Sequence, residues 1–100
     1  MIPLKTIEEL ISKHSLLEKE LSTGEVDKKL FAEKSKEYSD LNDIIDDAKK
    51  YFSYEGEKKD LEKILEDSSS EDEFKIMAQT ELNDLKVENE LIGKNLKLFL

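Results

Sequence analysis

The chain has 100 residues, of which 41% are charged, and its net charge of −9 argues against nucleic acid as its main binding surface. It has no cysteine, which excludes disulfides and thiolate metal sites, and all sixteen basic residues are lysine, which excludes bidentate arginine contacts to phosphate or guanine. Glycine and proline together number four, a composition that favours long solvated helices over sheet.

The first predicted helix covers residues 4–21. Its apolar residues form one stripe: Leu4, Ile7, Leu10, Ile11, Leu17 and Leu21, with Leu16 beside it. The start has two interpretations, a Thr6–Glu9 capping box or Pro3 in the first turn. Gly24 is expected to end the helix in a left-handed conformation.

The second predicted helix covers residues 27–66. One apolar track consists of Phe31, Tyr38, Leu41, Ile45, Ala48 and Phe52, and a neighbouring track consists of Leu41, Ile44, Ala48, Tyr51, Lys58, Leu61 and Leu65. The drift from one track to the other resembles a stutter. Gly56 lies where the tracks change, but no turn residue follows it, so we expect one helix of about forty residues with a bend at Gly56.

The third predicted helix covers residues 70–99, after a break at the serines 68–70. Ser70 and Glu73 have the spacing of a capping box. The apolar stripe consists of Phe74, Ala78, Leu82, Leu85, Ile92, Leu96 and Phe99, with Asn89 in register and Met77, Leu91 and Leu98 at its side. A stripe this long needs a partner of comparable length. We therefore predict an all-α domain over residues 1–100, in which a short first helix packs on a long, coiled-coil-like antiparallel hairpin.

The turn of this hairpin is expected near Ser69, so residues equally far from it should meet. This places Leu85 near Phe52 and Ile92 near Ile45, with Leu85 and Ile92 buried. Three helices can close one seam within a chain, which predicts a monomer or weak dimer.

The sequence offers no catalytic, cofactor-binding or metal-binding residues, and we expect no enzyme. His14 falls within an apolar stripe, where a packed residue is the favoured interpretation, because a catalytic base needs an orienting partner. The acidic runs 40–47 and 66–73 lack the alternating ligands and central glycine of a calcium loop. The three glycines are isolated, so no phosphate-binding loop is present.

The acidic charge, the helical pattern and the lack of a catalytic site favour an interaction module in the cytoplasm. Residues 1–5 lack the features of a signal peptide, and no apolar run approaches the length of a membrane span. A tRNA-gripping arm of the kind found in seryl-tRNA synthetases would need a basic stripe, which is missing. A self-associating coiled-coil scaffold or adaptor remains an alternative. The apolar ending at residues 98–100 favours a piece of a longer, multidomain chain.

Three segments carry a resemblance to a known family. They are residues 16–21 (LLEKEL), 34–41 (KSKEYSDL) and 77–82 (MAQTEL), followed by the apolar residues of 96–100. In this order they resemble the N-terminal domain of bacterial class I peptide chain release factors. The resemblance covers essentially all 100 residues and is closest to the members that read UAA and UAG, although the UAA/UGA-reading factor has a similar first domain.

The resemblance implies an accessory domain in translation termination. The family's stop-codon tripeptide and its Gly-Gly-Gln tripeptide, which promotes peptidyl-tRNA hydrolysis, do not occur in this sequence. The implied partner is the ribosome, at the stalk base of the large subunit. A class II release-factor GTPase and a release-factor glutamine methyltransferase are implied as further partners. An acidic arm suits basic ribosomal protein better than bare rRNA.

Overall fold

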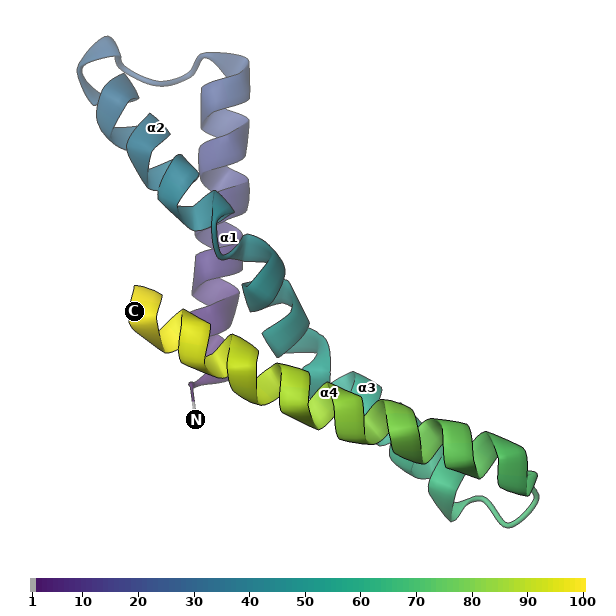
Figure 1. Ribbon diagram of the computed structural model, residues 1–100. Coiled ribbons are helices and arrows are strands. Elements are labelled where there is room, and N and C mark those ends of the chain that lie inside the picture. The colour runs from purple at the N-terminus through teal and green to yellow at the C-terminus, as the bar shows by residue number, and fades with distance from the viewer. Residues whose placement is uncertain (1) are drawn as a thin grey trace.

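The computed structural model describes residues 2–100, which form four helices and no strand (Figure 1). The helices are α1 (Leu4–Thr23), α2 (Lys28–Asn42), α3 (Ile45–Glu66) and α4 (Asp72–Phe99). The all-α prediction is confirmed, and the prediction of three helices is wrong. The molecule is elongated, with extents of 61 × 26 × 19 Å. Within residues 2–100, no helix is long and apolar enough to cross a membrane.

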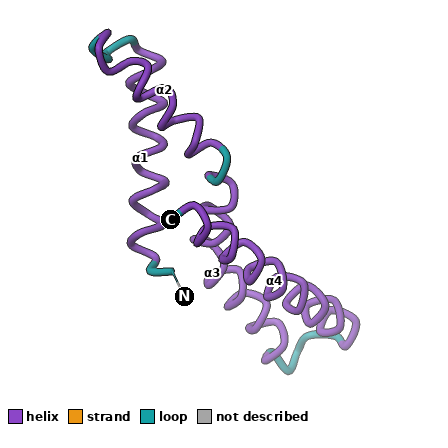
Figure 2. Tube along the Cα trace, turned by 60° about the vertical axis from the view of Figure 1, so that its left-hand side comes forward, coloured by secondary structure: helices purple, strands orange, loops and turns teal. Residues whose placement is uncertain are grey.

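The four helices form two hairpins that extend in different directions from a shared junction. Helices α1 and α2 make one hairpin, and α3 and α4 make the other, longer one (Figures 1 and 2). Helix α3 packs against each of the other three helices. Its N-terminal half therefore lies in the junction, while its C-terminal half contacts α4 alone at the far end of the molecule.

The helix predicted over residues 27–66 is in fact two helices, and the break lies at Asp43–Ile44 rather than at Gly56. Ile44 leaves the helical conformation, with φ −120° and ψ −1°, and its N–H donates to the carbonyl of Leu41 instead of a residue four positions back. Asn42 and Asp43 have low helix propensity, because their side chains compete for backbone hydrogen bonds. Asp46 and Asp47 then suit the positive end of the α3 dipole.

A contact to α1 holds the end of α2 in place. The Nε2 of His14 and the Oδ1 of Asn42 are joined by a hydrogen bond of 2.5 Å, and the His14 ring stacks on Tyr38 with centroids 4.9 Å apart. His14 is the one buried polar side chain among residues 2–100, and it is packed as expected. The break lets α2 and α3 both pack against α1, which a straight helix would not allow.

One of the two interpretations of the first helix start is confirmed, and the predicted start of the third helix is corrected. Helix α1 begins at Leu4 with Pro3 as its N-cap, so the Thr6–Glu9 box does not start it. Helix α4 begins at Asp72 with no side-chain cap, so the Ser70–Glu73 box does not form. Asp67 organises the loop instead, because its carboxylate accepts hydrogen bonds from both the backbone N–H and the hydroxyl of Ser69.

The apolar stripes of α1 and α4 are confirmed in their central parts. The junction core consists of Ile2, Ile7, Leu17, Leu41, Ile44, Ala48, Tyr51, Ile92 and Leu96. In α3 the buried residues come from both predicted tracks, Ile45 and Ala48 from the first and Ala48 and Tyr51 from the second, whereas Phe52 from the first track is exposed. Phe74 and Phe99, at the two ends of the α4 stripe, are exposed as well.

The antiparallel register is close to the predicted one, but the contacts differ. Lys50 of α3 pairs with Glu88 of α4 at 3.2 Å, two residues that are equally far from Ser69. Ile92 is buried as predicted, whereas Leu85 is only half-buried and Phe52 is exposed. Tyr51 lies against Gly93, where an added Cβ would lie 3.4 Å from its ring.

Leu96 and Leu98 provide a matched test of the junction core. Leu96 is fully buried and Leu98 is 88% exposed, although the two lie in the same turn of α4. Leu96→Ala should lower the free energy of unfolding by about 2–5 kcal/mol, because it leaves a cavity. Leu98→Ala should change it by less than about 0.5 kcal/mol. Urea unfolding followed by circular dichroism measures both, and equal effects would contradict the described core.

The glycines 56 and 24 should respond to alanine with opposite signs. Gly56 lies inside a continuous α3, and a Cβ there would meet nothing within 4 Å. Gly56→Ala should therefore raise the free energy of unfolding by up to about 1 kcal/mol. Gly24 has φ +72°, so Gly24→Ala should lower it by about 1 kcal/mol. A destabilising Gly56→Ala, measured in the same way, would show a bend at that residue.

The contact between His14 and Asn42 predicts that a substitution of Asn42, although it is at the surface, lowers the stability of the fold. Asn42→Ala removes the partner of a buried ring nitrogen and should lower the free energy of unfolding by about 1–3 kcal/mol. The control is Asn83→Ala, which removes an exposed hydrogen bond to Gln79. If thermal unfolding shows the two variants equally stable, the contact does not hold α2 in place.

Candidate interaction surface

The side chains best suited to catalysis or ligand binding lie apart from one another. His14 is enclosed between α1 and α2, and the amide of Gln79 bonds Asn83 one turn further along the exposed face of α4. Among residues 2–100, no three His, Cys, Asp or Glu side chains gather in a way that could hold a metal ion. Of the hollows on the surface, we consider two as candidates for contact with a partner, one at the end of the α3–α4 hairpin and one at the junction.

The first groove lies at the end of the α3–α4 hairpin, and we call it the tip groove. It has a volume of about 260 Å³ and is lined by Leu61, Ile64, Ser70, Phe74, Met77, Ala78 and Glu81. Ala78 is buried, while Phe74 and Met77 are each more than half exposed. Ala78 is smaller than every other residue of the α4 stripe, so the helix leaves a hollow at this position.

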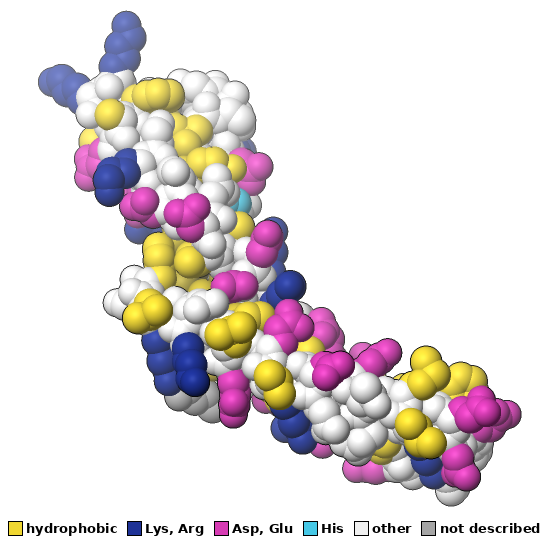
Figure 3. Space-filling model, in the orientation of Figure 1, with side chains coloured by type: hydrophobic (Ala, Val, Ile, Leu, Met, Phe, Trp, Pro, Cys, Tyr) yellow, Lys and Arg dark blue, Asp and Glu magenta, His cyan; other side chains and the backbone are white. Residues whose placement is uncertain are grey.

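Acidic residues surround the tip groove. Residues 60–81 hold eight of the 25 acidic residues but two of the 16 lysines, which gives them a net charge of −6 out of −9. Figure 3 shows hydrophobic and acidic side chains side by side at this end of the molecule. Within residues 2–100, the ion pairs lie elsewhere: Lys13–Glu37, Lys34–Glu20, Lys36–Asp40 and Lys50–Glu88. Lys63 and Lys75 lie among these eight acidic residues, and the charge of Lys75 acts on Asp67, but most of the negative charge of the tip has no lysine to balance it.

Hydrogen bonding affects one of these carboxylates and one lysine further along. The hydrogen bonds from the hydroxyl and the N–H of Ser69 lower the pKa of Asp67, so the loop keeps its negative charge at lower pH. Near the middle of the hairpin, the hydrogen bond to Glu88 and the charge of that residue raise the pKa of Lys50. Both effects favour the ionised forms at neutral pH.

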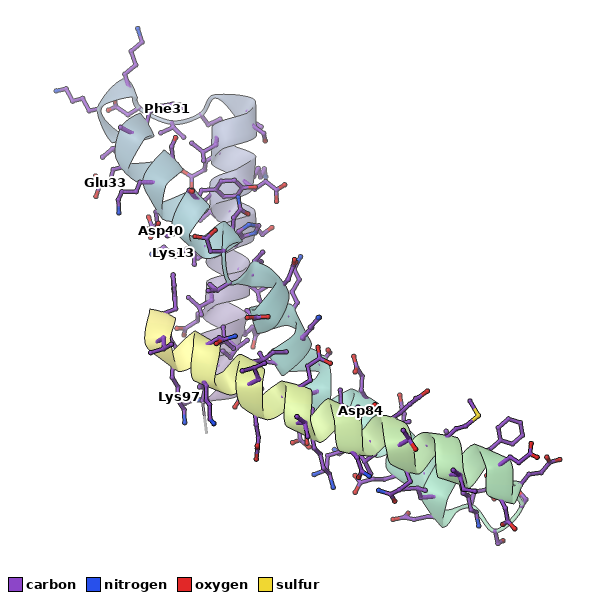
Figure 4. All side chains as sticks on the ribbon, viewed as in Figure 1. Lys13, Phe31, Glu33, Asp40, Asp84 and Lys97 are labelled. Carbon is purple, nitrogen blue, oxygen red and sulfur yellow. The ribbon has the colours of Figure 1, made fainter. Side chains whose placement is uncertain are left out.

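The second groove lies at the junction, where the first turn of α1 meets α3 and the last turns of α4. It has a volume of about 440 Å³ and is lined by Leu4, Tyr51, Tyr54, Glu55, Asn89, Glu90, Gly93, Lys94 and Lys97. Figure 4 shows Lys97 projecting from α4 in this region, while Phe31 lies at the end of the α1–α2 hairpin. The lining carries two acidic and two basic side chains, so it favours neither sign of charge in a ligand.

The sequence predicts Phe74 and Ala78 on the apolar stripe and Met77 beside it, but it does not predict the groove that they line. Ile64, which lines the groove from α3, belongs to neither predicted track. The signal was present in Ala78, a small residue between larger ones, and in the acidic residues on both sides of the loop.

Comparisons with known proteins relate the chain to one family. The model of the PCRF domain matches residues 10–100. Peptide chain release factor 1 of Pelagibacter ubique (strain HTCC1062) is 82% identical over 100 residues, which are all of this chain and 28% of that protein. Peptide chain release factor 1 of Lachnoclostridium phytofermentans is 33% identical over 98 residues, which cover 94% of this chain and 26% of that protein.

The chain therefore spans just over a quarter of the length of these two relatives. No solved structure matches it. The family model nevertheless covers nearly the whole chain, and the two relatives carry the same name. The chain belongs to the PCRF domain family.

Proposed function

We propose that this chain is a non-catalytic accessory domain, N-terminal in its protein, of a translation termination factor that directs peptide release at UAA and UAG. The observation that carries the proposal is the 82% identity, over the whole chain, to a protein named peptide chain release factor 1. The three glycines of the chain are isolated and Gln79 lies within α4, so the chain has no Gly-Gly-Gln element. Codon reading and hydrolysis are assigned to other parts of the protein.

The proposed partner is the ribosome in the cytoplasm, contacted at the stalk base of the large subunit. A net charge of −9 disfavours rRNA and favours basic ribosomal protein as the surface that is touched. The class II release-factor GTPase and a glutamine methyltransferase follow from the family resemblance alone. The scaffold alternative requires a second copy, and strong negative charge on each copy opposes such pairing.

Release assays on ribosomes stalled at UAA test the proposal. The 100-residue chain alone should release no peptide above background and should compete weakly with the complete protein. Deleting these residues from the complete protein should raise KM on the order of tenfold and change kcat little, because a binding contact is lost and the catalytic element is kept. The complete protein should act at UAA and UAG but not at UGA.

Three results would contradict the proposal. Stop-codon-dependent release by the chain alone would show that it carries the codon-reading and catalytic elements. If deletion of these residues from the complete protein changed neither KM nor kcat, they would have no accessory role in release. A tight dimer of the chain in sedimentation at micromolar concentration would favour the scaffold.

A further inference from the structure

The tip groove has an apolar surface that nothing in residues 2–100 covers. Its floor is the buried Ala78, and its rim carries the exposed side chains of Phe74, Met77 and Ile64. Helix α1 packs against α2 and α3, and it does not reach the tip (Figure 1). A rim of Phe and Met suits a contact surface, because methionine adapts its shape to a partner.

The charge around the groove selects among the possible occupants. A second copy would bring another tip with a net charge of −6 and be repelled. Nucleic acid and the anionic surface of a membrane are disfavoured for the same reason. A basic segment of another protein would instead gain from the excess negative charge of residues 60–81, to which the ion pairs of the described residues do not extend.

We infer that the tip groove binds a basic, amphipathic helical segment of a partner protein. One or two large apolar side chains of the segment enter the space between α3 and α4 above Ala78, and its lysines or arginines face the carboxylates of residues 60–81. Grooves between two helices receive such segments through anchors spaced three or four residues apart. The inference goes beyond the proposed function and does not depend on it, because it concerns the chemistry of the groove.

A defined peptide tests the inference. The probe is a fluorescein-labelled helix of leucine and lysine, with leucines on one face, and its control is a scrambled peptide of the same composition. Fluorescence anisotropy should show at least tenfold tighter binding of the amphipathic probe, because both peptides carry equal charge and only one presents an apolar face. A leucine and glutamate version should not bind. Equal binding of the probe and its scramble would overturn the inference.

Paired variants locate the binding site. Phe74→Ser combined with Met77→Ser should weaken probe binding at least tenfold. Its control is Val87→Ser combined with Leu91→Ser, which changes two comparably exposed residues of the same helix outside the groove. The control should weaken probe binding less than twofold. Circular dichroism should show all variants equally helical, since each substitution is at the surface. Equal effects of the two pairs would overturn the inference.

A second pair of variants tests the charge. Glu66→Gln, Glu73→Gln and Glu81→Gln together should weaken binding about threefold to tenfold, and added salt should reduce this difference. The control set, Glu8→Gln, Glu9→Gln and Glu18→Gln, removes the same charge from α1 and should have less effect. Equal effects would overturn the assignment of the basic face to the tip.

Two further measurements separate this inference from other outcomes. If the chain dimerises and the Phe74→Ser, Met77→Ser variant does not, the occupant is a second copy and the inference fails. Pelleting with large ribosomal subunits addresses the proposed function separately. If the probe discriminates as expected and the subunits do not bind, the groove assignment stands and the ribosomal partner is wrong.

Discussion

The packing of α3 between α1 and α4 is the constraint on which the rest of the structure depends. Ala48, fully buried, lies on the part of α3 that faces this junction, and a small side chain there lets the neighbouring helices approach closely. Gly93 does the same from α4, where an added Cβ would lie 3.4 Å from the Tyr51 ring. The hydroxyl of Tyr51 also accepts a hydrogen bond from the N–H of Ile2, which ties the start of the chain to the junction.

Helical periodicity was enough to predict most of this arrangement. The stripes of α1 and α4 are buried where another helix covers them, and Gly24 caps α1 as expected. The break at Asp43–Ile44 was missed because the segment has no glycine or proline. Its residues have low helix propensity, but the deciding contact joins Asn42 to His14, 28 positions away. Local spacing carries no information about such a contact.

The candidate surface could not be predicted from helical spacing either. An apolar stripe shows which face of a helix is buried, but not how far along the helix a partner covers it. The α4 stripe continues from the junction to the tip, and α3 packs along it; Ala78 and Leu82 are buried there, but Phe74 is exposed. The spacing of Phe74 places it on the apolar stripe, but its side chain is exposed at the surface. The Ser70–Glu73 spacing failed for a related reason, since Asp67 had already organised the loop through Ser69.

The break between α2 and α3 also determines how the molecule can bend. A continuous helix would be stiff, whereas this chain is interrupted at Asp43–Ile44. Helix α1 packs against the helices on both sides of the interruption. The stiffness of the chain at the interruption then comes from tertiary packing rather than from the backbone itself. Any event that loosens α1 would change the angle between the two hairpins while each hairpin keeps its own internal packing.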